Sequence, residues 1–131
     1  MRHLINIVEA ASLPDYVYHG TNLRLWNDDL PRTEPLCLTI DKKDAENYAE
    51  ESYISAHDHE DPLFFDAEIA PIIVRFKFSD LMSLDLEFHP DFGWDGVTDV
   101  TTWKQSLDAI GSFCVTGVTP ANKKIGKVIL L

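Results

Sequence analysis

The stretch Ile72-Ile73-Val74-Arg75-Phe76-Lys77-Phe78 is the clearest strand signal in the sequence. It begins as a continuous apolar run, which is typical of a strand buried on both faces, and it ends in an alternation of apolar and basic residues. Shorter β-rich or apolar runs lie on both sides of it, at residues 16–19, 36–40, 113–116 and 127–131. The sequence therefore predicts a protein built around a sheet, with residues 72–78 as a buried strand.

Three longer segments between and before these strands have the spacing of helices. Residues 2–11 carry apolar side chains at helical spacing, and a second helix begins after Asp41, a good N-cap. A third follows the capping-box sequence Thr102-Trp103-Lys104-Gln105 and ends at Gly111. Single helical turns are predicted at residues 23–26 and 79–81, and a loop over residues 86–100. Because the strands outnumber the helices and do not alternate with them regularly, the predicted fold class is α+β.

The length and composition indicate one domain that spans residues 1–131, with residues 1–15 as an N-terminal helical extension. No apolar run approaches the roughly 18 residues of a membrane span, and polar residues interrupt the first ten positions. We therefore expect a cytoplasmic protein without a membrane partner.

The charge of the chain is strongly negative and unevenly distributed. The formal net charge is −11, and residues 41–68 hold ten of the 22 acids but two of the 11 bases. Direct binding to a nucleic-acid backbone is disfavoured, because phosphate contacts need clustered Lys and Arg. The acidic segment is either a solvated face that keeps the protein soluble or a surface for a basic partner.

The spacing of the cysteines and histidines along the sequence does not predict a metal site. Cys37 and Cys114 are far apart and flanked by apolar residues, so we expect reduced core thiols. His57-Asp58-His59 is interpreted as a solvated helix end, since no third ligand is close in sequence. Asp85, Glu87 and His89 alternate, so a strand at this point would put them on one face, but nothing selects them as an acid/base set.

Three features occur in a suggestive order along the chain. The first is Tyr18-His19-Gly20-Thr21-Asn22 at the end of a strand. The second is Thr39 followed by Ala45 and Tyr48 on a helix, and the third is the late run from Ser112 to Pro120. In these features the sequence resembles the ADP-ribosyltransferase superfamily, especially its small stand-alone and phage-encoded members. The resemblance covers roughly residues 16–131.

This resemblance implies two small split β-sheets around a cleft that binds NAD as a substrate. It also implies transfer of ADP-ribose to a macromolecular acceptor, a host protein in the case of a phage or mobile-element effector in the bacterial cytosol. The implied catalytic residues are His19, Tyr48, Asp108 and Ser112. The implied NAD-binding residues are Tyr18, His19, Gly20, Thr21, Asn22, Thr39, Tyr48 and Tyr53.

The chemical roles follow from these residue types. An imidazole at a strand end suits a ribose hydroxyl, and glycine lets an amide ligand approach the backbone. An aromatic ring on the helix, Tyr48 or one turn later Tyr53, suits stacking on nicotinamide.

The sequence departs from the family at its catalytic acid. The family commonly places a Glu at the start of the late strand, where this chain has Ser112, and Glu87 is its last Glu. Either Asp108 replaces that acid, with Ser112 or Gln105 assisting, or the fold is catalytically inactive and acts as an acidic binding or inhibitor protein. A third alternative, an RNA 2′-phosphate-processing relative, is disfavoured by the scarcity of Arg and Lys near the predicted cleft.

Overall fold

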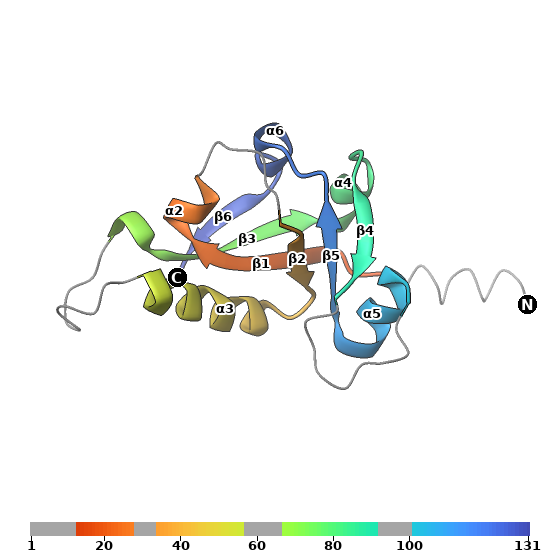
Figure 1. The fold of residues 1–131 in the computed structure, drawn as a ribbon, viewed down its shortest axis with the longest axis horizontal. Helices are drawn as coiled ribbons and strands as arrows, with labels where there is room; N and C mark the ends of the chain where they lie inside the picture. Colours follow the sequence, from red (N-terminus) through yellow and green to blue (C-terminus); the bar gives the residue numbers. More distant parts are fainter. Residues whose placement is uncertain (1–12, 28–33, 57–66, 92–100) are drawn as a thin grey trace, which may run out of the picture.

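The computed structural model describes residues 13–27, 34–56, 67–91 and 101–131. These residues form an α+β fold, as predicted, with one six-stranded antiparallel sheet (Figure 1). The strands are β1 (Tyr16–Asn22), β2 (Leu36–Thr39), β3 (Pro71–Lys77), β4 (Glu87–Pro90), β5 (Ser112–Thr116) and β6 (Lys127–Leu130). The helices are α2 (Leu23–Trp26), α3 (Lys42–Ala56), α4 (Phe78–Met82), α5 (Trp103–Ile110), α6 (Pro120–Lys123) and the 3₁₀ helix η1 (Ala67–Ile69). None of the helices in this part of the chain has the length and apolarity needed to cross a bilayer.

The sheet consists of two three-stranded halves joined at one position. Its strand order is β4-β5-β2-β1-β3-β6. β1 and β3 are paired along seven residues, and β2 and β5 along four, whereas β1 and β2 are paired only where Tyr18 lies opposite Thr39. The prediction of two separate sheets therefore needs correction. The split exists, but the Tyr18–Thr39 pairing makes the two halves one sheet.

One face of the sheet carries the main hydrophobic core. Along β5, Phe113 and Val115 belong to this core, while Ser112, Cys114 and Thr116 project to the opposite face. The Phe113 ring is stacked on Phe88 with 5.6 Å between centroids. The alternation along β5 therefore separates an aromatic core from a polar face.

Helix α3 runs along β1 on the face opposite the main core (Figure 1). It begins after Asp41, whose Oδ1 accepts a hydrogen bond of 2.9 Å from the Lys43 amide, as expected for the predicted N-cap. Ala45 and Ala49 are fully buried against the sheet, and a Cβ added to Gly20 would collide with the Ala45 carbonyl group. Gly20 is thus required for the close contact between β1 and α3.

The remaining secondary structure largely follows the sequence pattern. The helical turns predicted at residues 23–26 and 79–81 are α2 and part of α4, and α5 has both hydrogen bonds of the Thr102 capping box. Gly111 ends α5 with φ of 71°, a left-handed conformation that favours glycine. The predicted helix over residues 2–11 lies outside the described residues.

One local prediction was wrong, and one short helix was not predicted. Residues 87–90 form strand β4 instead of part of a loop, because Phe88 and Pro90 pair with β5 while Phe88 packs against the aromatic core. Residues 120–123 form the short helix α6, which was not predicted and which Thr119 caps through a 3.2 Å hydrogen bond from the Asn122 amide.

The cysteines are joined in a disulfide, contrary to the prediction of reduced thiols. They are 77 residues apart in sequence, but the antiparallel pairing of β2 with β5 places Cys37 directly opposite Cys114. This pairing brings the two side chains together on the polar face of the sheet.

Candidate functional site

A pocket of about 380 Å³ lies at the split between the two halves of the sheet. This volume is typical of small-molecule sites. Its walls come from β1, β2, α3, the end of β4 and the α5–β5 junction. The lining residues are Tyr18, His19, Gly20, Cys37, Leu38, Thr39, Asp44, Tyr48, Asp91, Ile110 and Ser112.

The pocket brings together most of the residues predicted from the sequence. Six of the predicted site residues line it: Tyr18, His19, Gly20, Thr39, Tyr48 and Ser112. Four others do not. Thr21 is buried in β1, Tyr53 lies half-buried further along α3, and Asp108 is exposed on α5. Asn22, the fourth, has a structural role.

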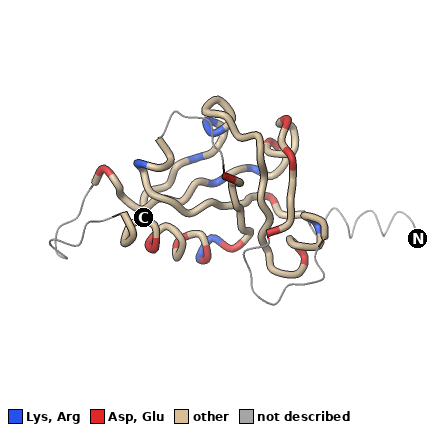
Figure 2. The backbone as a smooth tube through the Cα atoms, viewed as in Figure 1, with Lys and Arg blue, Asp and Glu red and all other residues tan. Residues whose placement is uncertain are grey.

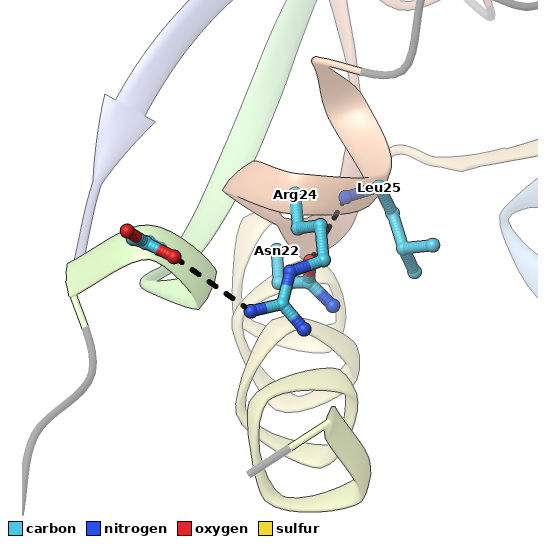
Figure 3. Close-up of polar contacts among 4 residues, drawn as sticks. Asn22, Arg24 and Leu25 are labelled. Carbon is cyan, nitrogen blue, oxygen red and sulfur yellow. Dashed lines mark hydrogen bonds and ion pairs between the residues drawn. The ribbon is translucent and has the colours of Figure 1, made fainter.

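Asn22 connects β1 to α2 and α3. Its side-chain oxygen accepts a 3.0 Å hydrogen bond from the Leu25 amide and so caps α2 (Figure 3). Its side-chain amide donates to Ser52 Oγ at 2.8 Å. In the same view, Arg24 forms an exposed ion pair with Glu68 of η1. Asn22, which is 1 % exposed, thus fixes the end of β1.

His19 reaches across the split in the sheet. Its Nδ1 lies 2.8 Å from the carbonyl oxygen of Cys37, and its ring centroid lies 5.9 Å from that of Trp26. A neutral imidazole that donates from Nδ1 to this carbonyl carries its lone pair on Nε2. The contact orients His19 at the pocket and connects the two halves beside the Tyr18–Thr39 pairing.

Tyr48 forms the α3 side of the pocket and is not a core residue. The side of α3 that carries Ala45 and Ala49 is buried, but Tyr48 remains 48 % exposed. Desolvation by partial burial, followed by the charges of Asp91, Asp44 and Glu51, raises the pKa of Tyr48 above its ordinary value of 10.0. The phenol is therefore uncharged at neutral pH and presents an aromatic ring with a hydrogen-bonding hydroxyl.

Asp91 is a site residue that sequence reasoning missed. Ser112 Oγ donates a 3.0 Å hydrogen bond to Asp91 Oδ2. The Asp91 amide donates to the hydroxyl of fully buried Ser106 at 2.9 Å, and that hydroxyl donates to the Ser112 carbonyl at 2.6 Å. Two serines from α5 and β5 thus hold the acid at the pocket. The signal for it was the alternation of Glu87 and His89, which Asp91 continues.

The pocket has a negative electrostatic character. Asp44 and Asp91 belong to its lining, which includes no Lys or Arg among the described residues. Further acids follow the outer side of α3 (Figure 2). Such a pocket suits a neutral or positively charged group and disfavours phosphate.

Metal-binding atoms also meet at this site. The sulfurs of Cys37 and Cys114 and a carboxylate oxygen of Asp91 all lie within 4.8 Å of one another. In the disulfide form, the sulfurs are bonded to each other and provide no thiolate ligand.

Fold and site together define an α+β protein with a polar, acid-lined pocket at a split in its sheet. Comparisons with protein-family models, curated proteins and solved structures give no match.

Proposed function

We propose that this protein is an ADP-ribosyltransferase that takes NAD as a substrate and transfers ADP-ribose to a protein acceptor. The observation that carries the proposal is the convergence of Tyr18, His19, Thr39, Tyr48 and Ser112 on one pocket. These residues come from four separate segments, and the resemblance to the family assigned all of them to one NAD site.

The pocket suits the nicotinamide riboside end of NAD. Tyr48 supplies a ring for stacking on nicotinamide, and His19 supplies a nitrogen for a ribose hydroxyl. The nicotinamide ring of NAD carries a positive charge, which the carboxylates of Asp44 and Asp91 attract. The diphosphate then extends beyond the acidic lining.

Asp91 takes the role of the acid that the late strand lacks. Its carboxylate is hydrogen-bonded to Ser112, the residue that occupies the usual position of the family's Glu. A fixed carboxylate at this point stabilises the positive charge that develops on the ribose as the bond from C1′ to the nicotinamide nitrogen breaks. Nicotinamide leaves with the bonding electron pair, and an acceptor nucleophile attacks C1′ and loses its proton.

Calorimetric titration with NAD, together with mass spectrometry of released nicotinamide, tests the proposal. We expect binding and slow nicotinamide release, both weakened by His19→Ala and Tyr48→Ala. Tyr53→Ala is a matched control, because this tyrosine lies on the same helix outside the pocket lining. If the folded wild-type protein does not bind NAD and does not release nicotinamide, the assignment is refuted.

A second candidate function is a binding protein without turnover. The exposed acids Glu50 and Glu51, with half-buried Glu46, give α3 an acidic surface suited to a basic partner (Figure 2). Replacing the three with Lys should abolish binding of a lysine-rich peptide and leave NAD affinity unchanged. Unaltered peptide binding in this variant would eliminate the second candidate.

A further inference from the structure

We propose that the reduced protein binds Zn²⁺ through the thiolates of Cys37 and Cys114 and the carboxylate of Asp91. This site forms part of the pocket wall, since Cys37 and Asp91 are lining residues. The inference goes beyond the proposed function and does not depend on it, because its ligands and its test involve no nucleotide.

The sheet places the two cysteines at the separation that zinc requires. Cys37 and Cys114 are direct partners in antiparallel strands, and their Cα atoms lie 4.0 Å apart. Two sulfurs at about 2.3 Å from a tetrahedral zinc ion lie roughly 3.7 Å from each other. Once the disulfide is reduced, side-chain rotation allows this spacing without movement of the strands.

Asp91 completes a set of three ligands. Its carboxylate oxygen already lies within 4.8 Å of both sulfurs. The hydrogen bond from Ser112 Oγ to Asp91 Oδ2 is the kind of contact that orients a metal-bound carboxylate. His89 lies in the same row of the sheet, but its Nε2 is 2.9 Å from Thr116 Oγ1, and it is not part of this cluster.

The donor types favour zinc over magnesium or calcium. Two thiolates and one carboxylate form a soft, anionic set, whereas magnesium and calcium prefer oxygen ligands alone. With three protein ligands, the fourth tetrahedral position is left to water or a pocket ligand, as in catalytic zinc sites.

Metal binding and the disulfide exclude each other. A phosphine reductant transfers two electrons to the Cys37–Cys114 bond, takes up a water oxygen as phosphine oxide, and leaves two thiols. Zinc binding then releases the thiol protons. The pair therefore exists either as the disulfide or as metal ligands, according to the redox state.

The test uses Co²⁺ as a spectroscopic substitute for Zn²⁺ in the whole chain, reduced with a phosphine and kept without oxygen. We expect thiolate-to-cobalt charge-transfer absorption that saturates at one equivalent and disappears when Zn²⁺ is added. The oxidised protein should give no such band. Absence of the band in the reduced, folded protein would overturn the proposal, as would a band accompanied by loss of the folded circular dichroism spectrum.

Matched variants then assign the ligands. Cys37→Ser and Cys114→Ser should each abolish the charge-transfer band of a two-thiolate site, and Asp91→Asn should weaken Co²⁺ binding at least about tenfold. Asp44→Asn changes a second acid of the pocket that is outside the cluster, and it should leave the affinity for Co²⁺ unchanged. Equal affinities for the Asp91 and Asp44 variants would show that Asp91 is not a ligand and would overturn the three-ligand site.

Discussion

Ser112 Oγ donates a 3.0 Å hydrogen bond to Asp91 Oδ2, which places a carboxylate next to the first residue of β5. The acid comes from the end of β4, the neighbouring strand, instead of from β5 itself. This relationship shows how the pocket obtains a fixed negative charge without a Glu in the late strand.

The first prediction separates the two candidate acids. Under the proposed transferase activity, Asp91→Asn should reduce nicotinamide release about 100-fold, because the mutation removes the carboxylate proposed to stabilise the ribosyl cation. Asp108→Asn should have little effect, since Asp108 is exposed on α5 and does not line the pocket. The rate of nicotinamide release at saturating NAD, measured for each variant, tests both effects. A large loss in Asp108→Asn and little loss in Asp91→Asn would instead indicate Asp108 as the acid of the proposed reaction.

The second prediction concerns the titration of Tyr48. Burial and the nearby acids raise its pKa, so the folded protein holds the phenol proton more tightly than the unfolded chain does. The unfolded state then binds fewer protons above the ordinary value of 10.0, and the contribution of Tyr48 to stability falls as the pH rises through that region.

Asp91→Asn should move the titration of Tyr48 toward lower pH, because one of the acids that opposes phenolate formation is gone. Ultraviolet difference absorbance of tyrosinate, with Tyr48→Phe as the reference that lacks this group, measures the change. An unchanged Tyr48 titration would show that Asp91 does not act on this phenol.

The third prediction concerns the packing of β1 on α3. Gly20→Ala should destabilise the protein by about 3 kcal/mol, since the added Cβ would meet the Ala45 carbonyl group and lie 2.9 Å from the Ala49 nitrogen. Urea unfolding measures this change. Asn47→Ala, at an exposed position of the same helix, is the control and should change stability little. A fully stable Gly20→Ala protein would contradict the close contact.

How far the sequence predicted this fold depends on how local the determining contacts are. The Thr102 capping box, the Gly111 helix end and the β3 strand were predicted because neighbouring residues determine them. Strand β4 was missed because its four residues are stabilised by pairing with β5, which is distant in sequence. The strand propensity of four residues does not reveal that they pair with a strand distant in sequence.

The same limit applies to the site. Tyr18, His19, Thr39, Tyr48 and Ser112 were identified from the family resemblance, and the structure brings them together. Asp91 and the contact between Cys37 and Cys114 depend on which strands are neighbours. No spacing in the sequence encodes the strand order that creates these contacts.

The fourth prediction concerns the disulfide. Reduction should lower the free energy of unfolding by about 3 kcal/mol, because the bond closes a long loop between residues 77 apart and restricts the unfolded chain. Urea denaturation with and without a phosphine reductant measures the difference. The Cys37→Ser/Cys114→Ser double variant should show no response to the reductant. An equal response would assign the effect to something other than this bond.

The order of the strands also governs when the pocket forms during synthesis. Strand β2 lies between β1 and β5, so Ser112 on β5 must leave the ribosome before the wall opposite Tyr48 exists. A nascent chain that ends earlier presents His19 and Tyr48 without their opposite wall and leaves β2 with an open edge. The pocket is therefore incomplete until β5 is available, and translation products that end before Ser112 should lack it.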